Sequence, residues 1–67
     1  MWVNHYYDCV NLDRIISFEM DGDANEIHFH LDIGGWVIIW NFPNTEKANK
    51  VYDRLTELMK AIDFTND

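Results

Sequence analysis

The stretch from Glu26 to Phe42, EIHFHLDIGGWVIIWNF, constrains the fold more than any other part of the sequence. Apolar and polar residues alternate up to a Gly-Gly pair, which permits the positive φ angles that a tight β-hairpin turn needs. Two registers fit this pattern: a two-residue loop pairs Ile33 with Trp36, and a four-residue loop pairs Leu31 with Trp36. Both registers place the same residues on the same face, because they differ by an even number of positions.

The alternation also assigns the two faces of this hairpin. Side chains alternate across a strand, so the apolar set is expected to face the core and the mixed set to face outward. The inner set comprises Ile27, Phe29, Leu31, Ile33, Trp36, Ile38, Trp40 and Phe42. The outer set comprises Glu26, His28, His30, Asp32, Val37, Ile39 and Asn41.

Two further strands are expected upstream of the hairpin. The segment RIISFEMDGDAN predicts a strand that runs into a turn rich in Gly, Asn and Asp. Its alternation places Ile15, Ser17 and Glu19 on the outer face. The N-terminal segment WVNHYYDCV is aromatic and β-prone, and it predicts one edge strand followed by a turn at residues 11–13.

After Pro43 the spacing of the apolar residues changes to that of a helix. The apolar stripe comprises Ala48, Val51, Tyr52, Leu55, Leu58, Met59 and Ile62. Asn44 or Thr45 suits the N-cap, and Glu46 suits the positive end of the helix. The predicted fold is one α+β domain over residues 1–67. It is a four-stranded antiparallel β-meander in residues 1–43 with a C-terminal amphipathic helix, residues 44–64, packed on one face (β-β-β-β-α).

Composition limits the class of protein. A chain of 67 residues buries only a marginal core, and its single cysteine, Cys9, excludes an internal disulfide. A lone thiol is typical of a reducing compartment, and the start MWVNHYYD lacks the features of a signal peptide, so we expect a cytoplasmic protein. The longest apolar run, Trp36 to Trp40, is far shorter than the roughly 18 residues of a membrane helix.

The net charge of −7 is concentrated in the predicted sheet. Residues 1–43 carry seven acids and one base, whereas residues 44–67 carry five acids and four bases. Such a sheet repels phosphate backbones, which proteins bind through Lys and Arg. We therefore expect no direct nucleic-acid binding.

The outer sheet face has no second layer in the predicted fold and is the candidate functional surface. Apolar residues rimmed by charges are typical of a protein-binding patch. The candidate partner-binding residues are Ile15, Glu19, Glu26, His28, His30, Asp32, Val37 and Ile39. We expect a non-enzymatic protein-binding module that acts through this acidic face or through an edge strand on a protein partner, which the acidity suggests is basic. The uncovered face and the open strand edge both favour a homodimer.

Two alternatives remain open. One is a small acidic inhibitor that mimics the charge of DNA and blocks a nucleic-acid-handling or defence enzyme. The other is a metal-binding protein in which His28 and His30, two positions apart on one strand, supply imidazole ligands. Polar residues on the wet side of a strand are the simpler interpretation of these histidines, so we expect neither a metal nor another cofactor. His5 and Cys9 need not meet on an extended segment, and cysteine is often simply buried, so we expect no catalytic residues.

The order of strands ending in one amphipathic helix resembles the closing part of a pleckstrin-homology-like domain. It is also similar, in order only, to the single-stranded-DNA-binding transcriptional coactivator domain, a dimer of β4α units. The strands of this chain depart from that family because they carry one base against seven acids. In size and acidity the chain is similar to small phage-encoded inhibitors of host defence. None of these similarities rests on a motif, so none implies a particular site residue.

Overall fold

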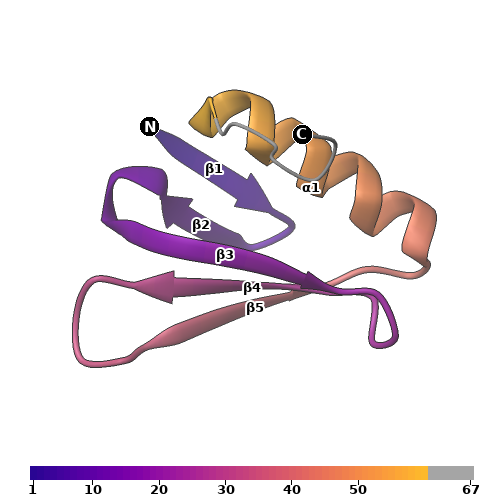
Figure 1. Ribbon diagram of the computed structural model, residues 1–67, viewed down its shortest axis with the longest axis horizontal. Helices are drawn as coiled ribbons and strands as arrows, with labels where there is room; N and C mark the ends of the chain where they lie inside the picture. The colour runs from indigo at the N-terminus through magenta and orange to yellow at the C-terminus, as the bar shows by residue number, and fades with distance from the viewer. Residues whose placement is uncertain (61–67) are drawn as a thin grey trace, which may run out of the picture.

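The computed structural model describes residues 1–60, which form an α+β fold with two antiparallel sheets and a C-terminal helix (Figure 1). The three-stranded sheet contains β3 (Ile15–Asp21), β4 (Glu26–Leu31) and β5 (Val37–Asn41), in that order. The two-stranded sheet pairs β1 (Trp2–His5) with β2 (Asp8–Asn11). A short 3-10 helix, η1 (Leu12–Arg14), leads from β2 into β3, and the helix α1 spans Thr45–Met59.

The N-terminal segment forms a hairpin of its own, where the sequence predicted a single edge strand. His5 pairs with Asp8 across a two-residue turn, and Tyr6 reverses the chain there with a φ of 56°. Val3 and Val10 from this hairpin pack against the core. Two sheets of two and three strands therefore replace the four-stranded meander that the sequence predicted.

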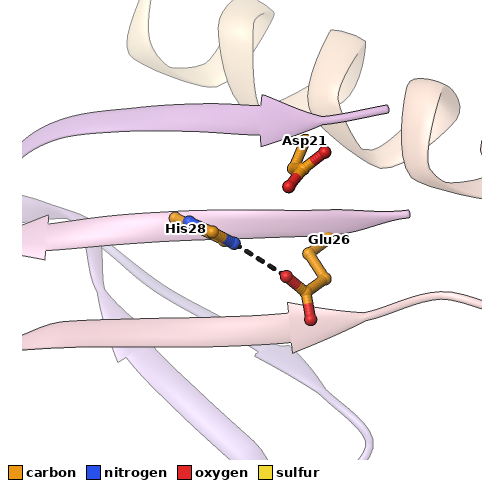
Figure 2. Close-up of side chains that lie close together, drawn as sticks. All are labelled: Asp21, Glu26 and His28. Carbon is orange, nitrogen blue, oxygen red and sulfur yellow. Dashed lines mark hydrogen bonds and ion pairs between the residues drawn. The ribbon is translucent and has the colours of Figure 1, made fainter. Parts of the chain in front are cut away.

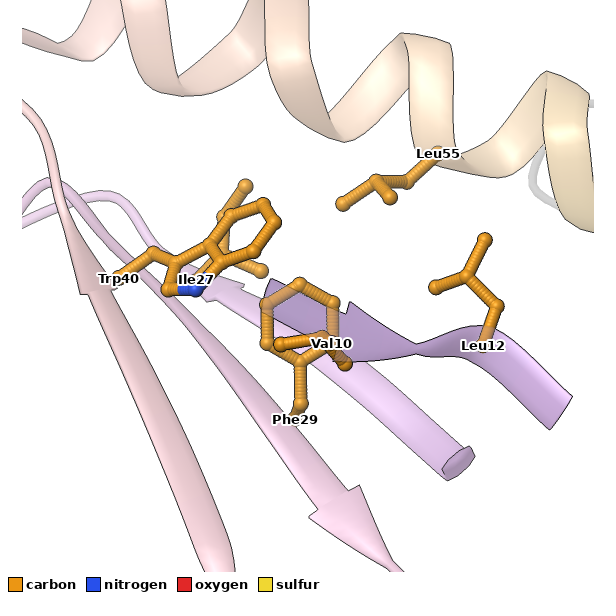
Figure 3. Packing of buried hydrophobic residues seen from close by; sticks show 6 residues of the cluster. All are labelled: Val10, Leu12, Ile27, Phe29, Trp40 and Leu55. Atoms are coloured by element: carbon orange, nitrogen blue, oxygen red, sulfur yellow. The ribbon is translucent and has the colours of Figure 1, made fainter. Parts of the chain in front are cut away.

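The hairpin of β4 and β5 adopts the four-residue loop. The Leu31 amide donates to the Trp36 carbonyl oxygen at 3.0 Å, and Gly34 and Gly35 have φ angles of 60° and 71°. On the inner face Ile27, Phe29 and Trp40 are buried, as the alternation predicted. Figure 3 shows these side chains packed with Val10, Leu12 and Leu55, so that α1 and the β1–β2 hairpin together cover this face.

Two residues predicted for the core lie outside it. Ile33 and Trp36 are 57% and 70% exposed. They lie at the closed end of the hairpin, where Trp36 belongs to the last pair before the loop. The Trp36 ring lies against the turn, because a Cβ atom on Gly34 would be 3.2 Å from Trp36 Cδ1.

A register shift in β3 changes the face of another predicted residue. Ile15 pairs with Leu31, but Ser17 pairs with His30, so Ile16 is an extra residue in the ladder. An extra residue of this kind reverses the alternation on its N-terminal side. Ile15 therefore packs against the core and Ile16 is 70% exposed, which corrects the expectation that Ile15 lies on the outer face.

The helix α1 begins where the sequence predicted. The Asn44 side chain caps it by accepting a hydrogen bond from the Lys47 amide at 2.9 Å. Of the apolar stripe, Ala48 and Leu55 are buried, and the stripe residues packed beside the core are Val51, Tyr52, Leu58 and Met59. Lys60 ends the helix with a φ of 54°, whereas the predicted helix continued to residue 64; Ile62 and the rest of that range lie outside the described residues.

Candidate functional site

The outer face of the three-stranded sheet is a regular grid of nine side chains. The strand registers align three rows: Asp21–Glu26–Asn41, Glu19–His28–Ile39 and Ser17–His30–Val37. Each strand supplies one column, so the face changes from acidic on β3, through histidine on β4, to apolar on β5. We call these nine residues the outer face.

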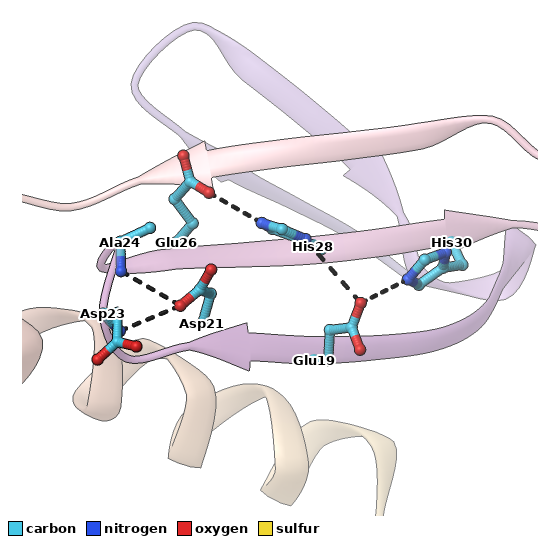
Figure 4. A network of polar contacts seen from close by, with 7 residues as sticks. All are labelled: Glu19, Asp21, Asp23, Ala24, Glu26, His28 and His30. Atoms are coloured by element: carbon cyan, nitrogen blue, oxygen red, sulfur yellow. Dashed lines mark hydrogen bonds and ion pairs between the residues drawn. The ribbon is translucent and has the colours of Figure 1, made fainter.

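A chain of polar contacts crosses the first two columns (Figure 4). His28 Nε2 lies 2.9 Å from Glu26 Oε1, and its Nδ1 lies 3.9 Å from Glu19 Oε1. The same Glu19 oxygen lies 2.9 Å from His30 Nε2. Glu19 therefore stands between the two histidines, and each imidazole is oriented by a carboxylate.

Six of the eight predicted site residues lie together on the outer face. The six are Glu19, Glu26, His28, His30, Val37 and Ile39. Ile15 packs inward as described above. Asp32 follows the end of β4, where its carboxylate lies 3.5 Å from Arg14 Nε and its amide donates to the Arg14 carbonyl oxygen. Asp32 is therefore part of an ion pair beside the outer face.

Asp21 is a residue that the sequence analysis missed. The segment around it is rich in Gly, Asp and Asn, which placed Asp21 in a predicted turn. Its Oδ1 does accept hydrogen bonds from the amides of Asp23 and Ala24. It is also the last residue of β3 and lies directly opposite Glu26. The signal available in the sequence was its even spacing from Glu19, which places both carboxylates on one face of the strand.

The described residues contain one group of side chains with the geometry of metal ligands. One ligand atom from each of Asp21, Glu26 and His28 lies within 4.8 Å of the other two (Figure 2). His30 is not a member of this group. The structure therefore pairs His28 with carboxylates, and it does not bring His28 and His30 together as the sequence-based metal hypothesis required.

The apolar column lies on an edge strand. Antiparallel ladders alternate hydrogen-bonded and non-hydrogen-bonded pairs, and Leu31–Trp36 is hydrogen-bonded. Val37 and Ile39 therefore direct their amide and carbonyl groups away from β4, toward an edge that has no neighbouring strand in residues 1–60. Their side chains are 42% and 45% exposed. Side chains of β5, VIIWN, include no charged group of the kind that commonly protects a sheet edge.

The turn between β1 and β2 borders the far end of this edge. His5 Nε2 donates to the Asn41 carbonyl oxygen at 2.9 Å, and the His5 ring packs on Trp40 and Phe42. A shallow hollow of about 260 Å³ lies between β5 and this turn, lined in part by Tyr6 and Tyr7. The open part of the edge is therefore at Val37 and Ile39.

His5 and Cys9 form no catalytic pair. Cys9 lies opposite Asn4 in the β1–β2 ladder, whereas His5 lies opposite Asp8, so the two side chains occupy opposite faces of the hairpin. Cys9 is exposed, although cysteines are often buried.

The basic residues of the described chain lie elsewhere. Arg14 pairs with Asp32, and on α1 Lys50 and Arg54 lie 3.7 and 3.4 Å from Glu46 and Glu57. No Lys or Arg belongs to the outer face as the registers of residues 15–41 define it. On the outer face, the carboxylates of Glu19, Asp21 and Glu26 therefore have only histidines beside them as side chains that can carry a positive charge.

Searches of protein-family models, curated proteins and solved structures find no match to the chain. Within residues 1–60, no helix has the length and apolar character needed to cross a membrane.

Proposed function

We propose that the chain is a non-enzymatic protein-binding module that forms a homodimer along β5 and presents its outer face to a basic protein partner. The observation that supports this proposal is the uncharged edge strand β5, which shares a sheet face with the carboxylates of Glu19, Asp21 and Glu26. Natural sheets usually protect such an edge with charges, proline or a covering element. In the dimer, a second copy would provide the missing strand.

Antiparallel pairing of two β5 strands is geometrically self-complementary. A two-fold axis at Ile38 would place Val37 opposite Ile39 of the other chain, clear of Asn41, whose carbonyl oxygen accepts from His5. The outward amide and carbonyl groups of Val37 and Ile39 would then gain partners. Each three-stranded sheet would continue into the other.

Charge favours this arrangement over a dimer packed face to face. Strands in a sheet are about 4.8 Å apart, so the two β3 columns would be separated by five spacings, about 24 Å. That separation exceeds the screening length of about 8 Å at physiological ionic strength. Sheets packed face to face lie about 10 Å apart, and their carboxylates would repel one another directly.

The dimer would also create a larger binding surface. The Val37 and Ile39 side chains of both copies would form a central apolar strip, with the carboxylates of Glu19, Asp21 and Glu26 on both sides of it. An apolar centre with a charged rim suits a partner that carries an apolar side chain among lysines or arginines. The acidic rim would determine which partners bind and how fast they associate.

The dimer can be tested by removing one backbone donor. Ile39→Pro deletes an amide that points away from β4, so the fold should persist while edge pairing is lost. Ile39→Thr is the matched control, because it shortens the same side chain and keeps the amide. Sedimentation equilibrium should find a dimer for the wild type and the threonine variant, and a monomer with wild-type circular dichroism for the proline variant. A wild type that stays monomeric at high concentration would contradict the dimer.

The basic partner can be tested by two double variants that change the net charge by the same amount at different places. The double variant Glu19→Gln with Glu26→Gln removes two carboxylates from the outer face, and Glu46→Gln with Glu57→Gln removes two from α1. Capture of a basic protein from a cell lysate should be weakened by the first pair and unaffected by the second. Equal capture by all three proteins would contradict binding at the outer face. If DNA competes for the captured protein, the charge-mimicking inhibitor becomes the better description.

A further inference from the structure

The row at the β3–β4 turn brings metal-ligating groups together on the outer face. Asp21 and Glu26 are directly opposite each other, and His28 lies two residues along β4 on the same face. Figure 2 shows the three side chains converging from the two strands. Their ligand atoms lie within 4.8 Å of one another, and a tetrahedral zinc site needs about 3.3–3.6 Å between ligand atoms. Rotation of the exposed Asp21 side chain and of the half-buried Glu26 and His28 side chains can close that difference without moving the strands.

The charges at this point of the sheet favour a cation. Like charges directly opposite each other destabilise an antiparallel pair, and here they are the carboxylates of Asp21 and Glu26. Neither carboxylate has an ion pair with a Lys or Arg within residues 1–60. Glu26 instead lies 2.9 Å from the imidazole of His28, whose side chain is 24% exposed. A divalent cation among the three would replace the repulsion with attraction.

The groups around the three side chains resemble the outer shell of a metal site. A histidine that binds a metal through one nitrogen commonly directs the other toward a carboxylate. His28 has a related arrangement, because Nε2 lies 2.9 Å from Glu26 and Nδ1 is on the side of Glu19 Oε1, 3.9 Å away, which is longer than a hydrogen bond. On the other strand, the amides of Asp23 and Ala24 hold Oδ1 of Asp21, which leaves its second oxygen for a ligand.

The surface beside these groups is hollowed. A depression of about 380 Å³ is lined by Glu19, Met20, Asp21, Gly22 and His28. It gives a cation access from solvent and leaves space for water molecules to complete its coordination. Glu26 borders the group from the opposite side, across the ladder from Asp21.

We propose that Asp21, Glu26 and His28 bind one divalent transition-metal ion of the zinc class, with water completing its coordination. One imidazole and two carboxylates are a ligand set that zinc accepts, and three protein ligands leave a position open. The ion would bind through Nε2 of His28 and replace the present hydrogen bond between Nε2 and Glu26. The site uses β3 and β4 of a single chain, so it does not depend on the dimer or on a protein partner.

Titration of the tag-free, metal-free protein with zinc chloride tests the proposal by isothermal titration calorimetry. The expected stoichiometry is one ion per chain. His28→Gln and Glu26→Gln should each weaken zinc binding by about tenfold or more, whereas His30→Gln should change it by less than about twofold. His30 is the matched control, because it lies on the same strand and face and also contacts a carboxylate.

Each outcome decides for or against the site. Circular dichroism of every variant confirms folding, and Asp21→Asn, which keeps an oxygen for the turn amides, replaces any ligand variant that fails to fold. Absence of zinc binding in the wild type would overturn the proposal. Equal weakening by His28→Gln and His30→Gln would also overturn it, since it would mean adventitious binding to surface histidines. Retention of zinc binding in the monomeric Ile39→Pro variant separates this site from the proposed dimer.

Discussion

Trp40 provides the most direct test of how the sheet faces are assigned. Its side chain is only 2% exposed, on the inner face of β5. It packs edge-on against Phe29, with ring centroids 4.7 Å apart, and against the His5 ring at 5.1 Å. Trp40→Ala would therefore remove contacts that join β5 to β4 and to the β1–β2 hairpin.

The expected loss is large compared with the stability of so small a domain. Truncation of a buried tryptophan to alanine costs about 3–5 kcal/mol. At about 0.05–0.15 kcal/mol per residue, a chain of 67 residues has a total free energy of unfolding of about 3–10 kcal/mol. Trp40→Ala should therefore remove between a third of this stability and all of it.

Trp40→Phe refines the prediction. Within the described residues, Trp40 Nε1 is buried without a hydrogen-bond partner, and a group of this kind costs about 1–3 kcal/mol. Phenylalanine keeps an aromatic ring against Phe29 and removes that group. Trp40→Phe should therefore lose less than half of the stability that Trp40→Ala loses.

Urea unfolding followed by circular dichroism at one protein concentration measures these differences. Trp36→Ala is the matched control, because Trp36 is on the same predicted face but is 70% exposed, and it should change stability by less than about 0.5 kcal/mol. If Trp36→Ala cost as much as Trp40→Ala, the packing described for the hairpin would be refuted. An unchanged midpoint for Trp40→Ala would mean that the two faces are reversed.

Three further substitutions, two of them with a matched control, test local features of the fold by the same unfolding measurement. Asn44→Ala should cost about 1 kcal/mol, because it removes the side chain that caps α1; no loss would mean that the cap contributes nothing. Gly34→Ala should cost about 1–2 kcal/mol, because alanine is strained at a φ of 60°. Gly22→Ala, its control, should be neutral or stabilise by up to about 1 kcal/mol, because nothing lies within 4 Å of an added Cβ atom and φ is not positive. Ile15→Ala should cost about 1–3 kcal/mol, because Ile15 is only partly buried, and Ile16→Ala less than about 0.5 kcal/mol. The reverse order for the two isoleucines would contradict the register shift in β3.

Much of the candidate site could be predicted from the sequence, because strand periodicity is a local property. The polar positions of EIHFHL fixed the outward direction of His28 and His30, whatever the hairpin register proved to be. The same argument placed Val37 and Ile39 outward. Contacts among these side chains were not predictable, since they depend on which residue of β3 lies opposite each residue of β4. That register places Glu19 between the histidines and Asp21 opposite Glu26.

The sequence by itself determined the elements whose signals are periodic: the β4–β5 hairpin, the inner positions of Ile27, Phe29 and Trp40, and the stripe and N-cap of α1. Periodic signals can be read from the sequence because many residues of one element contribute to the same pattern of core and solvent positions.

Only the tertiary structure decided the features that depend on a single residue. The turn at Tyr6 contains no glycine or asparagine that would have predicted it from the sequence. The neighbouring His5 holds the hairpin in place through its contacts with Asn41, Trp40 and Phe42. The extra residue in β3 likewise exchanges the positions of Ile15 and Ile16 through its pairing with β4. In both places the local preference of the chain is weak, and burial against segments distant in sequence determines the conformation.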